Sequence, residues 1–131
     1  MAQAVAPFTL DAFEQDPPYC EDGPAAYARA RIAKTFTGDI EGASTVEMLS
    51  VRVDGQGAGY VALERVVGSV EGRQGSFALL HVGTMEGDAV WARWPVVPGS
   101  GTGELAGISG EGRIEIGPDG AHAFHLDYEL P

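Results

Sequence analysis

Three side chains that can accept or release a proton lie on one predicted surface of the chain. Glu64 and His81 belong to two apolar segments joined by a tight turn, and Glu47 belongs to the segment before them. A carboxylate beside an imidazole can act as general base and general acid on a bound molecule. A cyclase or an isomerase of a small apolar substrate needs this chemistry, and we predict Glu64, His81 and Glu47 as its catalytic residues.

The same residues also have a structural interpretation. A carboxylate inside an apolar lumen is destabilising unless it is paired, and His81 would supply the partner for Glu64. Such a pair fixes the register of two strands without any reaction, and buried ion pairs are often structural. Both interpretations require that the two side chains face each other, which depends on the elements that carry them.

Those elements are predicted by regularly spaced turns in which glycine accompanies Asp, Glu or Pro. The segments between the turns, roughly 8–12 residues each, are rich in Val, Ile, Thr and aromatic residues, as in antiparallel sandwiches and barrels. Only residues 24–33 approach a helical pattern, and even there Ala28 to Ile32 alternates as a strand does. The turns are Gly38-Asp39, Asp54-Gly55, Glu71-Gly72-Arg73, Glu86-Gly87-Asp88, Pro98-Gly99-Ser100-Gly101 and Gly117-Pro118-Asp119-Gly120.

Turn positions predict the register, and the register predicts which side chains share a face. A two-residue loop at Gly72-Arg73 places Glu64 opposite His81, and a loop at Asp54-Gly55 adds Glu47 to the same face. A three-residue loop ending at Gly120 places Phe124 and Tyr128 on the apolar side. A slip of one residue would reverse any of these assignments. The side chains predicted to line a ligand site are Tyr60, Phe77, Leu79, Trp94, Phe124 and Tyr128.

The opposite face of the same strands is predicted to lie outside, because it holds Arg65 and Arg93. It is still apolar enough that an oligomer contact or the N-terminal arm is expected to cover part of it. We therefore expect a homodimer or a homotrimer. The apolar residues of this face are Val61, Leu63, Leu80 and Trp91.

Composition limits the class of protein. The 131 residues, 44% of them hydrophobic, suit one domain, with residues 1–26 predicted as a first strand around Phe8 to Phe13 and an irregular arm. A net charge of -11 excludes a basic nucleic-acid footprint. No apolar run reaches the roughly 18 residues of a transmembrane helix, and no basic segment precedes an apolar one at the N-terminus. We expect a cytoplasmic protein without a membrane partner.

No cofactor or metal is expected. Cys20 is the only cysteine, and His122 and His125 are three apart on a strand, so they point to opposite faces. Residues 101–106 match the letters of a dinucleotide fingerprint, but no helix follows, and Glu104 would set a carboxylate against the phosphate.

Several longer stretches resemble a bacterial family of small uncharacterised proteins. They are Lys34 to Gly42, Tyr60 to Gly68, Glu71 to Thr84, Val96 to Gly107 and Leu126 to Tyr128. That family is similar in fold to plant allene oxide cyclase, a short eight-stranded antiparallel barrel related in shape to lipocalins. The resemblance covers the chain from about Ala30 onward, and it implies an all-β, up-and-down, eight-stranded barrel. It specifies the family well and the function hardly at all.

A barrel of this size is either filled by side chains or holds one small ligand. Small residues on the predicted inner face favour a pocket, and three functions then remain: a cyclase or isomerase, a lipocalin-like carrier of a small hydrophobic molecule, or a purely structural protein. The sequence does not name the ligand. The small residues are Ala58, Ala62, Gly83 and Ala92.

Overall fold

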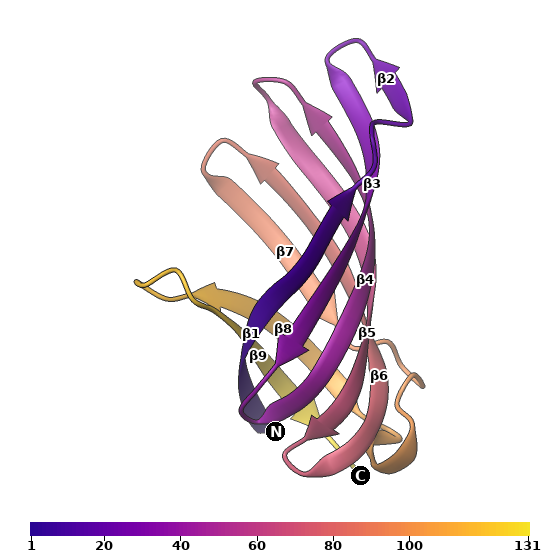
Figure 1. The fold of residues 1–131 in the computed structure, drawn as a ribbon, viewed down its shortest axis with the longest axis vertical. Helices are drawn as coiled ribbons and strands as arrows, with labels where there is room; N and C mark the ends of the chain where they lie inside the picture. Colours follow the sequence, from indigo (N-terminus) through magenta and orange to yellow (C-terminus); the bar gives the residue numbers. More distant parts are fainter.

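Alternating apolar and polar residues form nine β-strands in the computed structural model, which describes residues 1–131 (Figure 1). The one helical element is a single 3-10 turn, η1 (Gly103–Leu105), and no helix is long and apolar enough to cross a membrane. The strands are β1 (Ala2–Gln15), β2 (Cys20–Asp22), β3 (Ala25–Phe36), β4 (Ile40–Val53), β5 (Gly57–Val70), β6 (Arg73–Glu86), β7 (Ala89–Pro95), β8 (Ser109–Ile116) and β9 (His122–Glu129).

Eight of the strands close into an antiparallel barrel. Neighbours in sequence pair from β3 to β9, β9 pairs with β1, and β1 pairs with β3 to complete the circle. The short β2 lies outside the circle and pairs only with β3. The predicted all-β, up-and-down, eight-stranded barrel is therefore confirmed. Residues 1–26 are more regular than predicted, because β1 pairs along most of its length and β2 occupies part of the arm.

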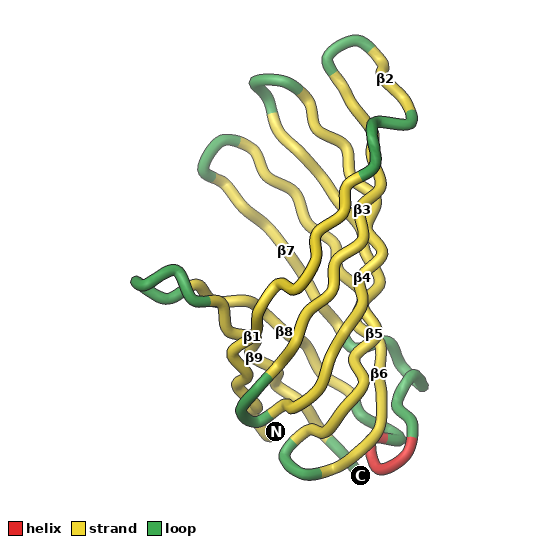
Figure 2. Tube along the Cα trace, viewed as in Figure 1, coloured by secondary structure: helices red, strands yellow, loops and turns green.

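The strands lie close together at one end of the barrel, which we call the closed end, and the hairpins splay apart at the other, which we call the open end (Figures 1 and 2). Both termini lie at the closed end. The hairpins β2–β3, β4–β5 and β6–β7 lie at the open end. Strands β7 and β8 pair only through Trp94 with Gly112 and Pro95 with Glu111. Beyond these two pairs the β8–β9 hairpin turns away from β7, so the wall has a seam that leads to the open end.

Side chains fill the closed end. The ring of Phe36 packs against those of Phe8 and Phe124, with centroids 5.5 and 6.0 Å away, and apolar residues from most of the other strands pack around them. Tyr128 closes this core and donates a hydrogen bond to Glu71 Oε1 at 2.5 Å. Four residues predicted to line a ligand site belong to this packed core: Phe77, Leu79, Phe124 and Tyr128.

The predicted registers need two kinds of correction. Glu64 lies opposite Leu79 and His81 opposite Ala62, because the β5–β6 loop is Glu71-Gly72. This shift of two residues keeps Glu64 and His81 on the same face. The β6–β7 pairs are displaced by two residues in the same way, so Ala92 lies opposite Gly83 instead of His81. The β8–β9 register is confirmed, with Ile114 opposite Phe124.

The β4–β5 register is wrong by one residue, and this reverses a face. Val53 pairs with Gly57, so the loop holds three residues, with Gly55 at a positive φ of 69° and a hydrogen bond from Gln56 N–H to the Val53 carbonyl. Glu47 consequently points outward and is exposed. It is not part of the acid–base cluster that the sequence predicted.

Candidate functional site

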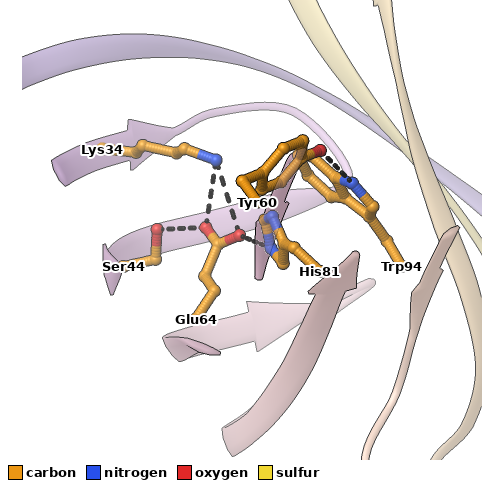
Figure 3. A network of polar contacts seen from close by, with 6 residues as sticks. All are labelled: Lys34, Ser44, Tyr60, Glu64, His81 and Trp94. Carbon is orange, nitrogen blue, oxygen red and sulfur yellow. Dashed lines mark hydrogen bonds and ion pairs between the residues drawn. The ribbon is translucent and has the colours of Figure 1, made fainter. Parts of the chain in front are cut away.

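Four polar side chains from four adjacent strands meet in the middle of the lumen (Figure 3). Lys34 comes from β3, Ser44 from β4, Glu64 from β5 and His81 from β6, and all are buried, with Glu64 only 1% exposed. Strand alternation accounts for their position, since each shares its inward face with apolar neighbours such as Ala30. The sheet therefore places one carboxylate, one amine, one imidazole and one hydroxyl together in an apolar interior.

Glu64 is the centre of this cluster, because all three neighbours contact its carboxylate. His81 Nε2 lies 2.8 Å from Oε1, and Ser44 Oγ donates a hydrogen bond to Oε2 at 2.5 Å. Lys34 Nζ lies 3.4 Å from each of the two oxygens. The prediction that Glu64 and His81 come within hydrogen-bond distance is confirmed, although they are not directly opposed in the ladder.

The cluster sets the charges of its members. Burial alone would raise the pKa of Glu64, but the His81 hydrogen bond, the Lys34 charge and the Ser44 hydrogen bond together hold that pKa below its usual value. Burial lowers the pKa of Lys34, and the nearby Glu64 carboxylate opposes that change only in part. Glu64 is thus ionised at neutral pH, and the Lys34 ammonium is less stable than an exposed one.

Aromatic rings cover the cluster on the side of the open end. The Trp94 indole stacks on His81 with ring centroids 3.6 Å apart, and its Nε1 donates a hydrogen bond to Tyr60 Oη at 3.3 Å. Tyr60 can lie there because Gly83 stands opposite it: a Cβ on Gly83 would be 2.5 Å from the tyrosine ring. Lys34 Nζ lies 4.9 Å from the ring centroid of Phe8 and 5.2 Å from that of Trp94.

A hollow of about 370 Å³ lies beyond these rings, on the inner face at the open end. Its volume falls within the range of small-molecule sites. Inward-facing small residues leave the space, and Tyr60 connects the hollow to the polar cluster through its bond to Trp94. The lining residues include Ala28, Ser50, Ala58, Tyr60, Met85 and, from β1, Phe13.

A second hollow, of about 430 Å³, lies on the outer face of the sheet. Leu49, Val61, Leu63 and Leu80 line it together with Glu47. It is the more open of the two, and no polar cluster lies near it. Ligand sites are typically concave and partly enclosed, so we favour the inner hollow as the binding site.

The predicted site residues fall into three groups. The structure brings Glu64 and His81 together beneath Trp94 and Tyr60, places Phe77, Leu79, Phe124 and Tyr128 in the packed core, and places Glu47 outside. Lys34 and Ser44 were not predicted. Lys34 is the only lysine of the chain, and its even spacing from Ala28, Ala30 and Phe36 would have indicated the inner face. No three His, Cys, Asp or Glu side chains converge as metal ligands would.

Comparisons with known proteins connect this architecture to one family. A family model described as "Protein of unknown function (DUF3224)" matches residues 4–128. A crystal structure of a protein with unknown function from that family, from Shewanella oneidensis MR-1, is 36% identical in sequence and superposes with a TM-score of 0.92. The match covers 100% of this chain and 98% of that one. No curated protein matches.

Proposed function

The chain belongs to the DUF3224 family of proteins of unknown function, and we propose that it binds a small, largely apolar molecule in the open end of its barrel. The observation that supports this proposal is the hollow of about 370 Å³ on the inner face, next to Tyr60. The closed end is packed with side chains and has no room for a ligand, whereas small residues such as Ala28 and Ala58 leave room here.

Tyr60 supplies the polar contact that would orient such a ligand. Its hydroxyl oxygen accepts the hydrogen bond from Trp94 Nε1, and the hydroxyl proton has no protein acceptor. It is therefore free to bond to a carbonyl or hydroxyl oxygen of a molecule in the hollow. One such donor in a mostly apolar pocket is the usual pattern of a small-molecule site.

Titration with N-phenyl-1-naphthylamine, a neutral apolar fluorophore, tests the proposal. We expect its emission to rise on binding and to be excited by energy transfer from Trp94, measured in a Trp91→Phe background because the chain has two tryptophans. Ala58→Phe fills the inner hollow and should abolish the signal. Val61→Phe, on the same strand but at the outer hollow, should leave it unchanged. If Val61→Phe abolished the signal and Ala58→Phe did not, the fluorophore would bind at the outer face and the proposal would be wrong.

A second candidate is acid–base catalysis by Glu64 and His81 on the bound molecule, as in a cyclase or isomerase. The observation that favours it is the 2.8 Å contact between an ionised carboxylate and an imidazole next to Trp94. Such a base would exchange the α-protons of a bound ketone. NMR of 2-heptanone in D₂O should then show deuterium incorporation that Glu64→Gln abolishes while fluorophore affinity is retained. Equal deuterium exchange in both proteins would show that Glu64 does not catalyse the exchange, and the protein would then bind the molecule without this chemistry.

A further inference from the structure

The barrel encloses an amine that neither candidate function uses. Lys34 is the only lysine, its side chain is 6% exposed, and its Nζ lies between the rings of Phe8 and Trp94. Resting on the proposed binding function, we propose that Lys34 is a carbonyl-reactive amine that captures an aldehyde or ketone in the lumen as an imine. The ligand class would then be small apolar carbonyl compounds.

The arrangement around Glu64 allows Lys34 to lose its proton. The carboxylate already has contacts at 2.5 Å to Ser44 and 2.8 Å to His81, both shorter than the 3.4 Å to Lys34. A neutral Lys34 therefore does not leave Glu64 without partners, which would be strongly destabilising. Burial favours the neutral amine as well, by lowering the Lys34 pKa. These are the conditions under which a lysine becomes a nucleophile.

The chemistry balances with the groups present. The Nζ lone pair forms a bond to the carbonyl carbon, the C=O π bond breaks, and the oxygen takes a proton to give a carbinolamine. Protonation of that hydroxyl and loss of water then form the C=N bond. Glu64 and His81 lie where a proton can leave the nitrogen and return to the oxygen. The product is a protonated imine, whose positive charge replaces the Lys34 ammonium beside Glu64.

Trp94 connects the amine to the hollow. Its ring centroid is 5.2 Å from Nζ, and its Nε1 bonds to Tyr60, which lines the hollow. A linear aldehyde would place its chain among the small residues of the open end and its carbonyl near the Tyr60 hydroxyl. Addition to Lys34 requires the carbonyl carbon to pass the edge of the Tyr60–Trp94 pair, so short, unbranched aldehydes should react best.

Reductive trapping tests the proposal, because the chain has only two amines, Lys34 Nζ and the exposed Met1 α-amine. The full-length protein is treated with hexanal and then borohydride at neutral pH, and the adducts are located by peptide mass mapping. We expect a hexyl group on Lys34 as well as on Met1, and more on Lys34 in the folded protein than in guanidinium. Lys34→Arg keeps the charge beside Glu64 and should be modified at Met1 alone. An unmodified Lys34 beside a modified Met1 would overturn the proposal.

The same samples separate failure of this inference from failure of the binding function. Ala58→Phe should reduce the Lys34 adduct and leave the Met1 adduct unchanged, because only Lys34 is reached through the hollow. If the naphthylamine binds and Lys34 stays unmodified, the ligand site stands and the imine chemistry is wrong. If the naphthylamine does not bind and Lys34 is still modified, the binding function is wrong and the amine is reactive for another reason.

Discussion

At the scale of single residues, Glu64 compensates the positive charge of Lys34, which would otherwise lie unpaired in an apolar interior. Replacing it by glutamine keeps the shape but leaves Lys34 buried without a counter-charge. Breaking a buried pair from one side usually destabilises by about 3–5 kcal/mol. We expect Glu64→Gln to lower the free energy of unfolding by about this amount, measured by urea denaturation.

The double variant Lys34→Met, Glu64→Gln is the matched control. Since it removes both charges, it should be more stable than Glu64→Gln alone, and the coupling in the double-mutant cycle should favour the wild-type pair. Additive effects of the two substitutions would show that Lys34 and Glu64 do not interact in the folded protein.

Tyr128 should make the stability of the folded protein depend on pH in the alkaline range, because its surroundings raise the pKa of its hydroxyl. Burial and then the Glu71 hydrogen bond raise its pKa from 10.0 to about 12. Between these pH values the folded state keeps a proton that the unfolded state has lost, so this contribution to stability is present below pH 10 and is lost as pH rises towards 12. Tyr128→Phe should be less sensitive to alkali over this range. The difference between the two proteins, followed by urea denaturation at each pH, isolates Tyr128, and a constant difference would contradict the assignment.

The sequence predicted the Glu64–His81 contact because side chains alternate between the two faces of a strand, so a register error of two residues leaves each side chain on the same face. Both faces of β5 and β6 were assigned correctly although the turn was misplaced. Glu47 was assigned to the wrong face because one extra loop residue, Gln56, changes the parity. Lys34 was missed since lysine is seldom buried, and only its charge partner on another strand, Glu64, makes that position tolerable.

At the scale of elements, glycines allow the strands at the closed end to approach closely. Gly42, Gly68 and Gly75 lie side by side across β4, β5 and β6. Gly68 has a φ of 155°, and a Cβ there would stand 2.1 Å from the Glu41 carbonyl oxygen. The clash is with backbone, so a side chain rotation cannot relieve it.

We therefore expect Gly68→Ala to destabilise the barrel by roughly 1–3 kcal/mol or more, the range for overpacking a well-packed site. Gly59→Ala on the same strand is the control, because its Cβ would meet nothing closer than 3.7 Å. Thermal unfolding followed by circular dichroism should show a large loss of stability for the first variant and little change for the second. Equal effects would mean that the glycine row is not a point of close contact.

The sequence pattern did not predict that β7 and β8 pair over only two residues. Turn spacing predicts which strands are neighbours, but not how far along their length they pair. Only Trp94 and Pro95 of β7 find partners on β8, and η1 lies in the long connection between the two strands. The length over which these two strands pair is set by tertiary packing, which turn spacing does not encode.

At the scale of the whole molecule, an apolar patch interrupts an outer surface that is otherwise rich in acidic residues. The chain carries a net charge of -11, yet the outer face of β4–β6 holds a continuous apolar patch bordered by Arg29, Arg65 and Glu47. Leu49 pairs with Val61 and Leu63 with Leu80, so the patch spans three strands. Its large side chains, 39–58% exposed, are Leu49, Val61, Leu63 and Leu80.

We expect a second or third copy of the chain to cover this patch. A soluble monomer rarely exposes such a continuous apolar surface, and a two-fold contact between identical patches would remove it from water. Light scattering at micromolar concentration should give a dimer or a trimer. Leu63→Glu, at a side chain 58% exposed in the middle of the patch, should give a monomer with unchanged circular dichroism. Ile116→Glu, at an apolar residue on β8 that is 66% exposed, should remain oligomeric. A monomeric wild-type protein would contradict the prediction and would mean that the patch is tolerated in water, where the high negative charge of the chain keeps copies apart.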